Sequence, residues 1–274
     1  MSSDVFALPG ADLVYEVDGT GPAVVLVHGF GLDLRMWQPQ VEPLTDDFQV
    51  VRYNCRGFGR AGAFDPSVPY THAGDLLALL DHLAIADATL VGLSFGGRVA
   101  LNTTLVSPTR VRGLALLGAL LDGVPWDSGS VAGLEELTRQ VAAGGVEAGR
   151  RAWMAHPLFA AARERPDLAA QLANMVADYP GQHWLGQDPE PPYDPQPIAV
   201  LETVAVPTLV VVGERDVPGF VEMADVLASR IRGAEYHRVP DAGHMVNMEA
   251  PEIVNALLAA FLSRIHSADH RSPD

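Results

Sequence analysis

Short runs of apolar residues alternate with amphipathic helical patterns along most of the chain. Strands are expected at Leu13–Val17, Ala23–His28, Gln49–Tyr53, Thr89–Leu93, Val111–Leu117, Thr208–Gly213 and Glu235–Val239. Helices are expected at about Met36–Leu44, Ala73–Leu83, Gly96–Val106, Val221–Ile231 and Pro251–Ile265. Several strand runs are nearly all apolar, which is typical of strands that helices cover on both sides. The pattern predicts an α/β fold with a mostly parallel sheet covered by helices on both faces.

The strand pattern disappears between Asp122 and Pro197, where short helical stretches take its place. This segment ends in DPEPPYDPQP, whose five prolines in ten residues predict a stiff, extended connector back to the sheet. We therefore expect a helical lid inserted into one α/β core. The expected boundaries are 1–121 and 198–265 for the core, 122–197 for the lid and 266–274 for a flexible, polar tail.

The composition narrows the possible classes of function. With 274 residues, of which 48% are hydrophobic and 19% charged, the chain can bury one large core. Its formal charge of −16 repels phosphate backbones and anionic lipid surfaces, so we expect neither nucleic acid nor a membrane as a partner. All 18 basic residues are arginine, which excludes Schiff-base, pyridoxal-phosphate and P-loop chemistry. The single cysteine, Cys55, excludes an internal disulfide framework and a multi-cysteine metal site.

Nothing in the sequence predicts export or insertion into a bilayer. The first ten residues, MSSDVFALPG, carry no cationic stretch, and Pro9 interrupts their apolar run. The run Gly113–Leu121 is uncharged but far shorter than the roughly 20 residues that cross a bilayer. We therefore expect a cytoplasmic protein.

The most informative motif is Gly92-Leu93-Ser94-Phe95-Gly96-Gly97, between an apolar strand run and a helical run. A serine on such a tight strand-to-helix turn has a strained backbone, and the residues two before and two after it must be small. Gly92 and Gly96 meet this requirement, and the helix N-terminus favours developing negative charge. The motif predicts Ser94 as a nucleophile. The alternative is a glycine-rich turn with a capping serine.

A second motif, HGFG at residues 28–31, follows the apolar run at 24–27. A glycine-bearing loop that leaves a sheet strand can turn a backbone N–H toward the mouth of a site. The N–H of Phe30 is therefore a candidate oxyanion donor, together with the N–H of Phe95. His28 is interpreted as a structural imidazole that hydrogen-bonds the loop, and direct catalysis by His28 is the alternative.

Two further loops place an acid and a histidine after predicted strands: GERD, which ends at Asp216, and DAGH, which ends at His244. A serine hydroxyl needs a base to remove its proton, and that base needs an acid to fix its tautomer. Asp216 and His244 fit these roles because the carboxyl ends of parallel strands meet at one edge of a sheet. The order of the three residues along the chain, serine then aspartate then histidine, is also the order expected for this architecture. Glu214, Asp241 and Asp122 are rival acids.

In chain order, HGFG, GLSFGG, GERD and the GH of residues 243–244 resemble the oxyanion loop, nucleophile elbow, acid loop and histidine loop of a lidded α/β-hydrolase. The resemblance spans nearly the whole chain and implies an eight-stranded-type sheet. It also implies Ser94 as nucleophile, Asp216 as acid and His244 as base, with the N–H groups of Phe30 and Phe95 as oxyanion hole. Relatives that dehalogenate or open epoxides carry aspartate in place of this serine, which disfavours those reactions. The compact lid and the elbow are most similar to the 3-oxoadipate enol-lactonase and carboxylesterase-like branch.

Several side chains of the predicted lid and of the helix after Ser94 could contact a substrate. The candidate substrate-binding residues are Trp126, Trp153, Phe159 and Trp184, with packing of the lid onto the sheet as the alternative. Arg98 could attract a substrate carboxylate, but pairing with an acid is the favoured interpretation. His156 and His183 of the lid could also contact substrate, but surface placement is the favoured interpretation. No histidine shows metal-ligand spacing, so we assign neither a metal nor a cofactor.

Together these features predict a serine hydrolase that cleaves a carboxylic ester or lactone through an acyl-enzyme. The partner is expected to be a small molecule with an apolar or planar body. One alternative keeps the same three residues but acts as a carbon–carbon bond hydrolase or as a cofactor-free perhydrolase or haloperoxidase. A less favoured alternative is a non-catalytic ligand-binding protein on the same fold. The sequence leaves the substrate and the oligomeric state open.

Overall fold

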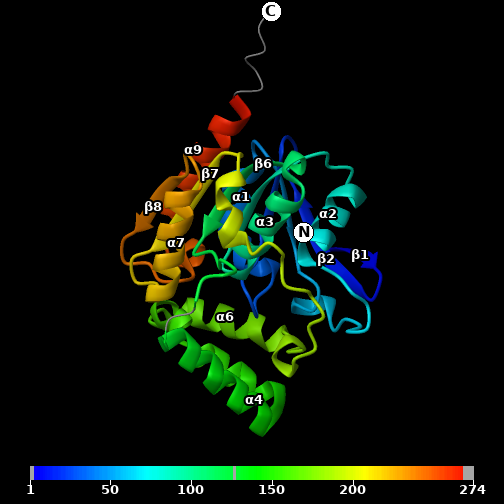
Figure 1. Cartoon of the computed structure of the whole chain (residues 1–274), viewed down its shortest axis with the longest axis vertical. Coiled ribbons are helices and arrows are strands. Elements are labelled where there is room, and N and C mark those ends of the chain that lie inside the picture. The colour runs from blue at the N-terminus through cyan, green and yellow to red at the C-terminus, as the bar shows by residue number, and fades with distance from the viewer. Residues whose placement is uncertain (1–2, 126–127, 268–274) are drawn as a thin grey trace, which may run out of the picture.

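Within residues 3–125 and 128–267, which the computed structural model describes, eight strands form a single sheet (Figure 1). Their order is β1-β2-β4-β3-β5-β6-β7-β8. The strands are β1 (Asp4–Leu8), β2 (Ala11–Asp18), β3 (Ala23–Val27), β4 (Gln49–Tyr53), β5 (Ala88–Leu93), β6 (Val111–Leu117), β7 (Thr208–Gly213) and β8 (Glu235–Val239). The β1–β2 and β2–β4 pairs are antiparallel, and every other pair is parallel. The predicted α/β class with a mostly parallel sheet is confirmed.

Each face of the sheet is covered by its own set of helices. These are α1 (Gln38–Thr45), α2 (His72–His82), α3 (Phe95–Val106), α7 (Pro218–Arg230), α8 (Val246–Glu249) and α9 (Pro251–Ser267). Successive strand residues point to opposite faces. Val24 and Leu26 of β3 therefore pack in the layer that contains α1, α8 and α9. Val25 and Val27 pack in the layer that contains α2, α3 and α7. Burial on both faces explains why β3 is apolar at every position.

Strand β1 was not predicted from the sequence. It lies at the edge of the sheet, and only its β2 side is paired. Four of its five residues are apolar, but only Phe6 and Leu8 are half-buried and the others are exposed, and the apolar run is short. Edge strands of this kind carry a weak hydrophobic signal because one face and one edge meet water.

A helical insertion lies between β6 and β7 and consists of α4 (Ser128–Ala155), α5 (Ala160–Arg163) and α6 (Pro166–Asp178). In Figure 1, α4 and α6 lie together at the end of the molecule opposite the C-terminal end of α9. Helix α4 spans 28 residues, but it is not one continuous helix. Its backbone is non-helical at Gly144 and Gly145, where φ is −138° and 66°, so two helical segments meet at this glycine pair. The connector at 188–196 contains neither helix nor strand.

Ion pairs tie the helical insertion to the sheet-bearing part of the chain. Asp178, at the end of α6, lies 2.7 Å from Arg35 and 3.2 Å from Arg60. Glu164, just after α5, pairs with Arg215 in the loop after β7. These contacts are exposed or only partly buried, so each contributes only about 0–1 kcal/mol and they orient the insertion more than they stabilise it.

The C-terminal helix extends slightly further than the sequence pattern predicts. Helix α9 continues to Ser267, two residues beyond the expected helix end, and the remainder of the expected tail, 268–274, lies outside the described residues. In the ranges 3–125 and 128–267, no helix combines the length and apolar character that a membrane span requires.

Candidate active site

Ser94 occupies a sharp turn between β5 and α3. Its φ and ψ are 56° and −117°, a backbone conformation that residues other than glycine rarely adopt. A Cβ on Gly92 would lie 2.2 Å from the Gly96 carbonyl oxygen, and a Cβ on Gly96 would lie 2.0 Å from the Val27 carbonyl oxygen. The predicted need for glycine on both sides of Ser94 is therefore confirmed.

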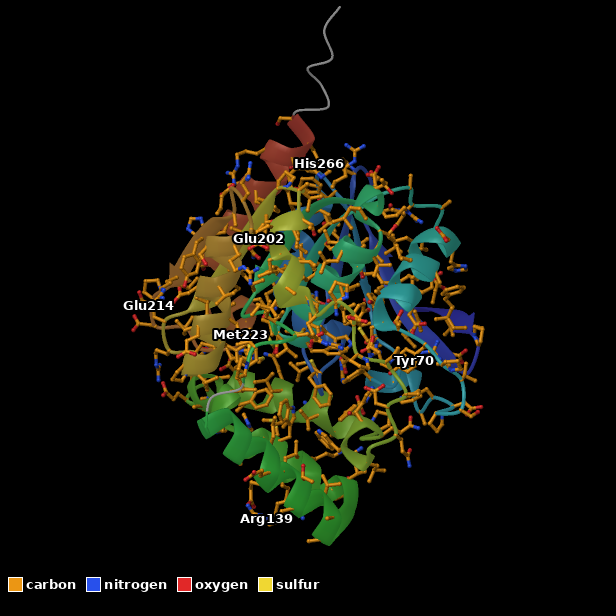
Figure 2. The ribbon with its side chains drawn as sticks, in the orientation of Figure 1. Tyr70, Arg139, Glu202, Glu214, Met223 and His266 are labelled. Atoms are coloured by element: carbon orange, nitrogen blue, oxygen red, sulfur yellow. The ribbon has the colours of Figure 1, made fainter. Side chains whose placement is uncertain are left out.

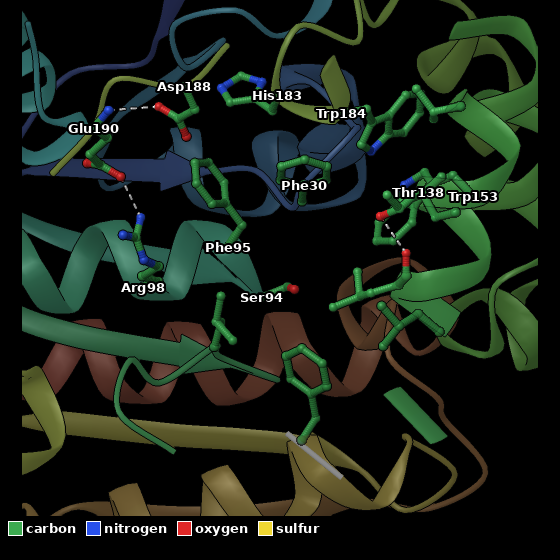
Figure 3. Close-up of a pocket in the computed structure, with 16 residues that line it drawn as sticks. Phe30, Ser94, Phe95, Arg98, Thr138, Trp153, His183, Trp184, Asp188 and Glu190 are labelled. Carbon is green, nitrogen blue, oxygen red and sulfur yellow. Dashed lines mark hydrogen bonds and ion pairs between the residues drawn. The ribbon is translucent and has the colours of Figure 1, made fainter. Parts of the chain in front are cut away.

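Backbone hydrogen bonds hold the strained turn in place. The Ser94 N–H donates to the carbonyl of Leu117 at 2.9 Å, and the Ser94 carbonyl accepts from Arg98 and Leu120 at 3.1 and 3.0 Å. Because Leu117 ends the neighbouring strand β6, the turn is fixed to the sheet on one side and to α3 on the other. The serine hydroxyl faces the cavity shown in Figure 3.

Asp216 and His244 come together from the loops after β7 and β8. His244 Nδ1 lies 2.9 and 3.0 Å from the two carboxylate oxygens of Asp216, and both side chains are buried. Asp216 Oδ1 also accepts the N–H of Val217 at 2.7 Å, which fixes the carboxylate. A carboxylate can only accept here, so Nδ1 carries the proton and Nε2 is left as the basic nitrogen.

The basic nitrogen of His244 has no hydrogen-bond partner among the described residues, although it is buried. The imidazole packs against Phe220, with ring centroids 4.2 Å apart. Phe220 and Ser94 line the same cavity. A buried, unsatisfied nitrogen is costly, and such atoms in native structures are often explained by a catalytic role.

Glu249 holds the histidine loop, a role that sequence reasoning missed. Its carboxylate accepts the N–H groups of Gly243 and Met245, which flank His244, at 2.6 and 3.0 Å. Burial raises the pKa of Glu249 despite these bonds. The sequence shows a glutamate five residues after His244. Only the three-dimensional turn of the loop shows that this side chain folds back to the backbone on both sides of the histidine.

The rival acids lie elsewhere. Asp122 hydrogen-bonds Arg98 at 2.7 and 2.9 Å. Glu214 is exposed at the surface of the molecule (Figure 2), and Asp241 is exposed in a turn with φ of 58°. Among these four carboxylates, Asp216 is the one that hydrogen-bonds His244.

Phe30 and Phe95 line the cavity together with Ser94. Phe95 begins α3, so its N–H has no intrahelical acceptor, and Phe30 lies in the loop after β3. Within the described part of the chain, neither N–H donates a hydrogen bond to another group. Both remain available to a ligand, as an oxyanion hole requires.

His28 is a structural residue. It is completely buried, and the N–H of Cys55 donates to its Nε2 at 2.9 Å. Nε2 must therefore hold the lone pair, and Nδ1–H donates to the carbonyl of Gly29 at 2.8 Å. Burial lowers the pKa of His28, which keeps the ring neutral. With both nitrogens engaged, the structural interpretation of His28 is confirmed.

The cavity at Ser94 has a volume of about 410 Å³. Its apolar wall comes largely from the helical insertion, and Figure 3 shows Trp153 and Trp184 on that side. Of the predicted substrate-binding residues, these two line the cavity. Phe159 does not, because it lies behind Trp153 with ring centroids 5.5 Å apart. Trp126 lies outside the described residues.

Arg98 forms part of the opposite, polar wall and is paired with two carboxylates. Its Nη1 lies 2.8 Å from Glu190, and its Nε lies 2.7 Å from Asp122. Burial opposes the charge, but the two carboxylates outweigh this effect and raise the pKa of Arg98. The expectation that Arg98 pairs with an acid is confirmed.

Asp188 and Glu190 were not recognised from the sequence as cavity residues, although both line it. They belong to the proline-rich connector. Asp188 Oδ1 accepts the Tyr70 hydroxyl at 2.9 Å and the Glu190 N–H at 3.0 Å. Glu190 in turn accepts the N–H of His72 at 2.8 Å. Their partners lie about a hundred residues earlier in the chain, so no local signal marks these two acids.

The predicted surface placement of His156 and His183 is wrong. His156 is buried, and its Nδ1 accepts the N–H of Leu158 at 3.3 Å. His183 lines the cavity and stacks on Phe58, with ring centroids 4.5 Å apart. Burial lowers the pKa of His183 to about 4, so the ring is neutral at neutral pH. Both imidazole rings pack against aromatic side chains, Trp153 for His156 and Phe58 for His183.

Within residues 3–125 and 128–267, no three histidine, cysteine, aspartate or glutamate side chains are grouped so that they could hold a metal ion.

A parallel sheet, a serine on a strained turn and an aspartate–histidine pair at the same edge define a hydrolase architecture. The family model described as alpha/beta hydrolase fold matches residues 22–251, and the chain belongs to this family. The predicted family resemblance is thereby confirmed.

Individual relatives include lactonases and esterases. 3-Oxoadipate enol-lactonase 1 of Acinetobacter baylyi is 25% identical over 264 residues, which cover 93% of this chain and 95% of the relative. The structure of a thermophilic esterase from Thermogutta terrifontis is 29% identical, with a TM-score of 0.81 and coverage of 97% of this chain and 100% of the other. The enol-lactonase structure from Burkholderia xenovorans LB400 is also 29% identical, with a TM-score of 0.80 and coverage of 95% and 100%.

Proposed function

We propose that this hydrolase cleaves a carboxylic ester or lactone, with Ser94 as nucleophile, His244 as base and Asp216 as the acid that orients His244. The observation that carries the proposal is the buried Asp216–His244 pair, whose free Nε2 belongs to an imidazole packed on a wall of the Ser94 cavity. Relatives named as esterases and enol-lactonases support the bond type.

The reaction proceeds in two halves. Ser94 Oγ gives its proton to His244 Nε2 and attacks the substrate carbonyl, and the N–H groups of Phe30 and Phe95 stabilise the oxyanion. The C–O bond to the leaving alcohol then breaks, and that oxygen takes the proton from His244. Water, deprotonated by His244, next attacks the acyl-enzyme. The ester bond to Ser94 Oγ breaks, that oxygen takes the proton back from His244, and the acid is released. Each oxyanion donor contributes about 2.7 to 4 kcal/mol of transition-state stabilisation in comparable sites.

The helical insertion serves as a lid over Ser94. The lid spans residues 122–197 in this proposal, between core segments 1–121 and 198–265. Leu134, Leu137 and Val141 of α4 line the cavity together with Ser94. Such a cover excludes water, which strengthens the electrostatic interactions at the reacting carbonyl. The apolar wall suits an acyl or alcohol group with an apolar or planar body.

A panel of p-nitrophenyl esters with acyl chains of about 2 to 12 carbons, assayed beside a set of lactones, tests the function. We expect kcat/KM to rise with chain length until the acyl group fills the cavity and then to level off or fall, because about 410 Å³ holds only a mid-length chain. Vinylogous diketones, and peroxide with a carboxylic acid, are the comparison substrates. Turnover of these with no turnover of any ester or lactone would contradict the proposal.

A further inference from the structure

The charges along the cavity wall point to a substrate class. This inference rests on the proposed ester or lactone hydrolysis. Three formally charged residues line the cavity at Ser94: Arg98, Asp188 and Glu190. Two are carboxylates, and the guanidinium is already paired with Glu190 and with Asp122, which is not a lining residue. No lining cation of the described chain is therefore left without a carboxylate partner.

The nearby His183 and His72 add no positive charge to the cavity at neutral pH. Burial lowers the pKa of His183 to about 4, and burial lowers the pKa of His72 well below its ordinary value. Both rings are neutral at neutral pH, so neither compensates a bound anion.

The paired Arg98 is poorly available to a substrate. Its side chain is 15% exposed, and that of its partner Glu190 is 3% exposed. A substrate carboxylate would have to displace a buried ion pair or bind beside it, and separating such a pair leaves an uncompensated buried charge. Asp188, by contrast, is exposed and lines the cavity. Figure 3 shows Asp188, Glu190 and Arg98 on one side of the cavity and the two tryptophans on the other, with Ser94 between them.

We propose that this cavity accepts uncharged esters and lactones and excludes those that carry a carboxylate, with Asp188 as the specificity-determining residue. An anionic substituent placed at the polar wall meets two carboxylates and an occupied guanidinium, and like charges at close range repel. The enol-lactonase relatives are named for the lactone of a dicarboxylic acid. This chain is therefore expected to differ from them in the charge of its substrate.

A matched set of esters tests the charge rule. The p-nitrophenyl esters of hexanoic acid and adipic acid place a methyl group or a carboxylate at the far end of acyl chains of equal length, and the succinyl and glutaryl esters cover shorter reaches. We expect kcat/KM for the hexanoyl ester to exceed that for the adipoyl ester by about tenfold or more at low salt. The ratio should shrink in about 0.5 M sodium chloride because Asp188 is exposed to solvent screening.

Asp188→Asn removes the charge but keeps an oxygen that can accept from Tyr70 and Glu190. The hexanoyl-to-adipoyl ratio should fall about threefold or more in this variant. Asp167→Asn is the matched control, because Asp167 is exposed at the start of α6 and does not line the cavity. That variant should keep the wild-type ratio.

Binding to Ser94→Ala separates the charge rule from the chemistry. This variant should bind the same esters without cleaving them, so their Kd values can be ranked by tryptophan fluorescence quenching even if the wild type turns over no ester. Tighter binding of the hexanoyl ester than of the adipoyl ester supports the charge rule. Equal or tighter binding of the adipoyl ester overturns it. Absence of all turnover by the wild type refutes the hydrolysis proposal instead.

Discussion

Replacing Ser94 with alanine should lower kcat for ester hydrolysis by about ten-thousand-fold to a million-fold. The variant loses the attacking oxygen, while the Phe30 and Phe95 N–H groups and the apolar wall remain. Fold stability should be nearly unchanged. Alanine meets the same backbone strain at φ of 56° as serine does, and the backbone hydrogen bonds to Leu117, Arg98 and Leu120 persist. Steady-state assays with a p-nitrophenyl ester, paired with urea unfolding, measure both quantities.

Ser107→Ala is the matched control for this variant. Ser107 lies at the opposite end of α3, and its hydroxyl makes no cap hydrogen bond to the short 3-10 helix that follows. The same substitution at this position should leave kcat within about twofold of the wild-type value, because surface substitutions away from special features have small effects. A loss of less than about tenfold in Ser94→Ala would show that a different group attacks the carbonyl.

Replacing Asp216 with asparagine should lower kcat by about ten-thousand-fold, by analogy with the same change in other serine triads. Asp216 forces the proton of His244 onto Nδ1. An asparagine amide that still accepts the Val217 N–H would turn its NH₂ group toward the ring, so Nδ1 would become the acceptor and Nε2 the protonated nitrogen. The base would then be unable to take the proton of Ser94. Kinetics with a p-nitrophenyl ester measure the loss.

The same carboxylate-to-amide change at two rival acids is the control for Asp216→Asn. Asp241→Asn and Glu214→Gln alter exposed side chains and should leave kcat within about threefold of the wild type. If either control falls as far as Asp216→Asn, or if Asp216→Asn retains most of its activity, the assignment of the acid is wrong.

Much of the fold could be read from the sequence because the central strands are buried on both faces. Val111–Leu117 and Thr208–Gly213, for example, are rich in apolar residues, and the predicted bounds match the observed strands end to end. The edge strand β1 gave a weaker signal, because its apolar run is short and three of its five residues are exposed to solvent. The two helical segments of α4 follow one another directly at the glycine pair 144–145, and the sequence pattern alone did not show how closely these stretches join.

The candidate site likewise contains residues that the sequence could predict and residues that it could not. Ser94, Asp216 and His244 follow strands, and parallel topology collects the carboxyl ends of strands at one edge, so their proximity was predictable. Asp188 and Glu190 were not predictable. Their place in the cavity depends on contacts with Tyr70, His72 and Arg98, which long-range folding brings to the connector. Local sequence carries propensity and spacing, but it does not carry such tertiary pairings.

Intact-protein mass spectrometry after treatment with a fluorophosphonate tests the central claim most directly. This reagent phosphonylates a serine only when a neighbouring base activates the hydroxyl. The account predicts a single adduct on the wild-type protein, located on the peptide that contains Ser94, and no adduct on Ser94→Ala. An unlabelled wild type, or a Ser94→Ala protein labelled to the same extent, would contradict it.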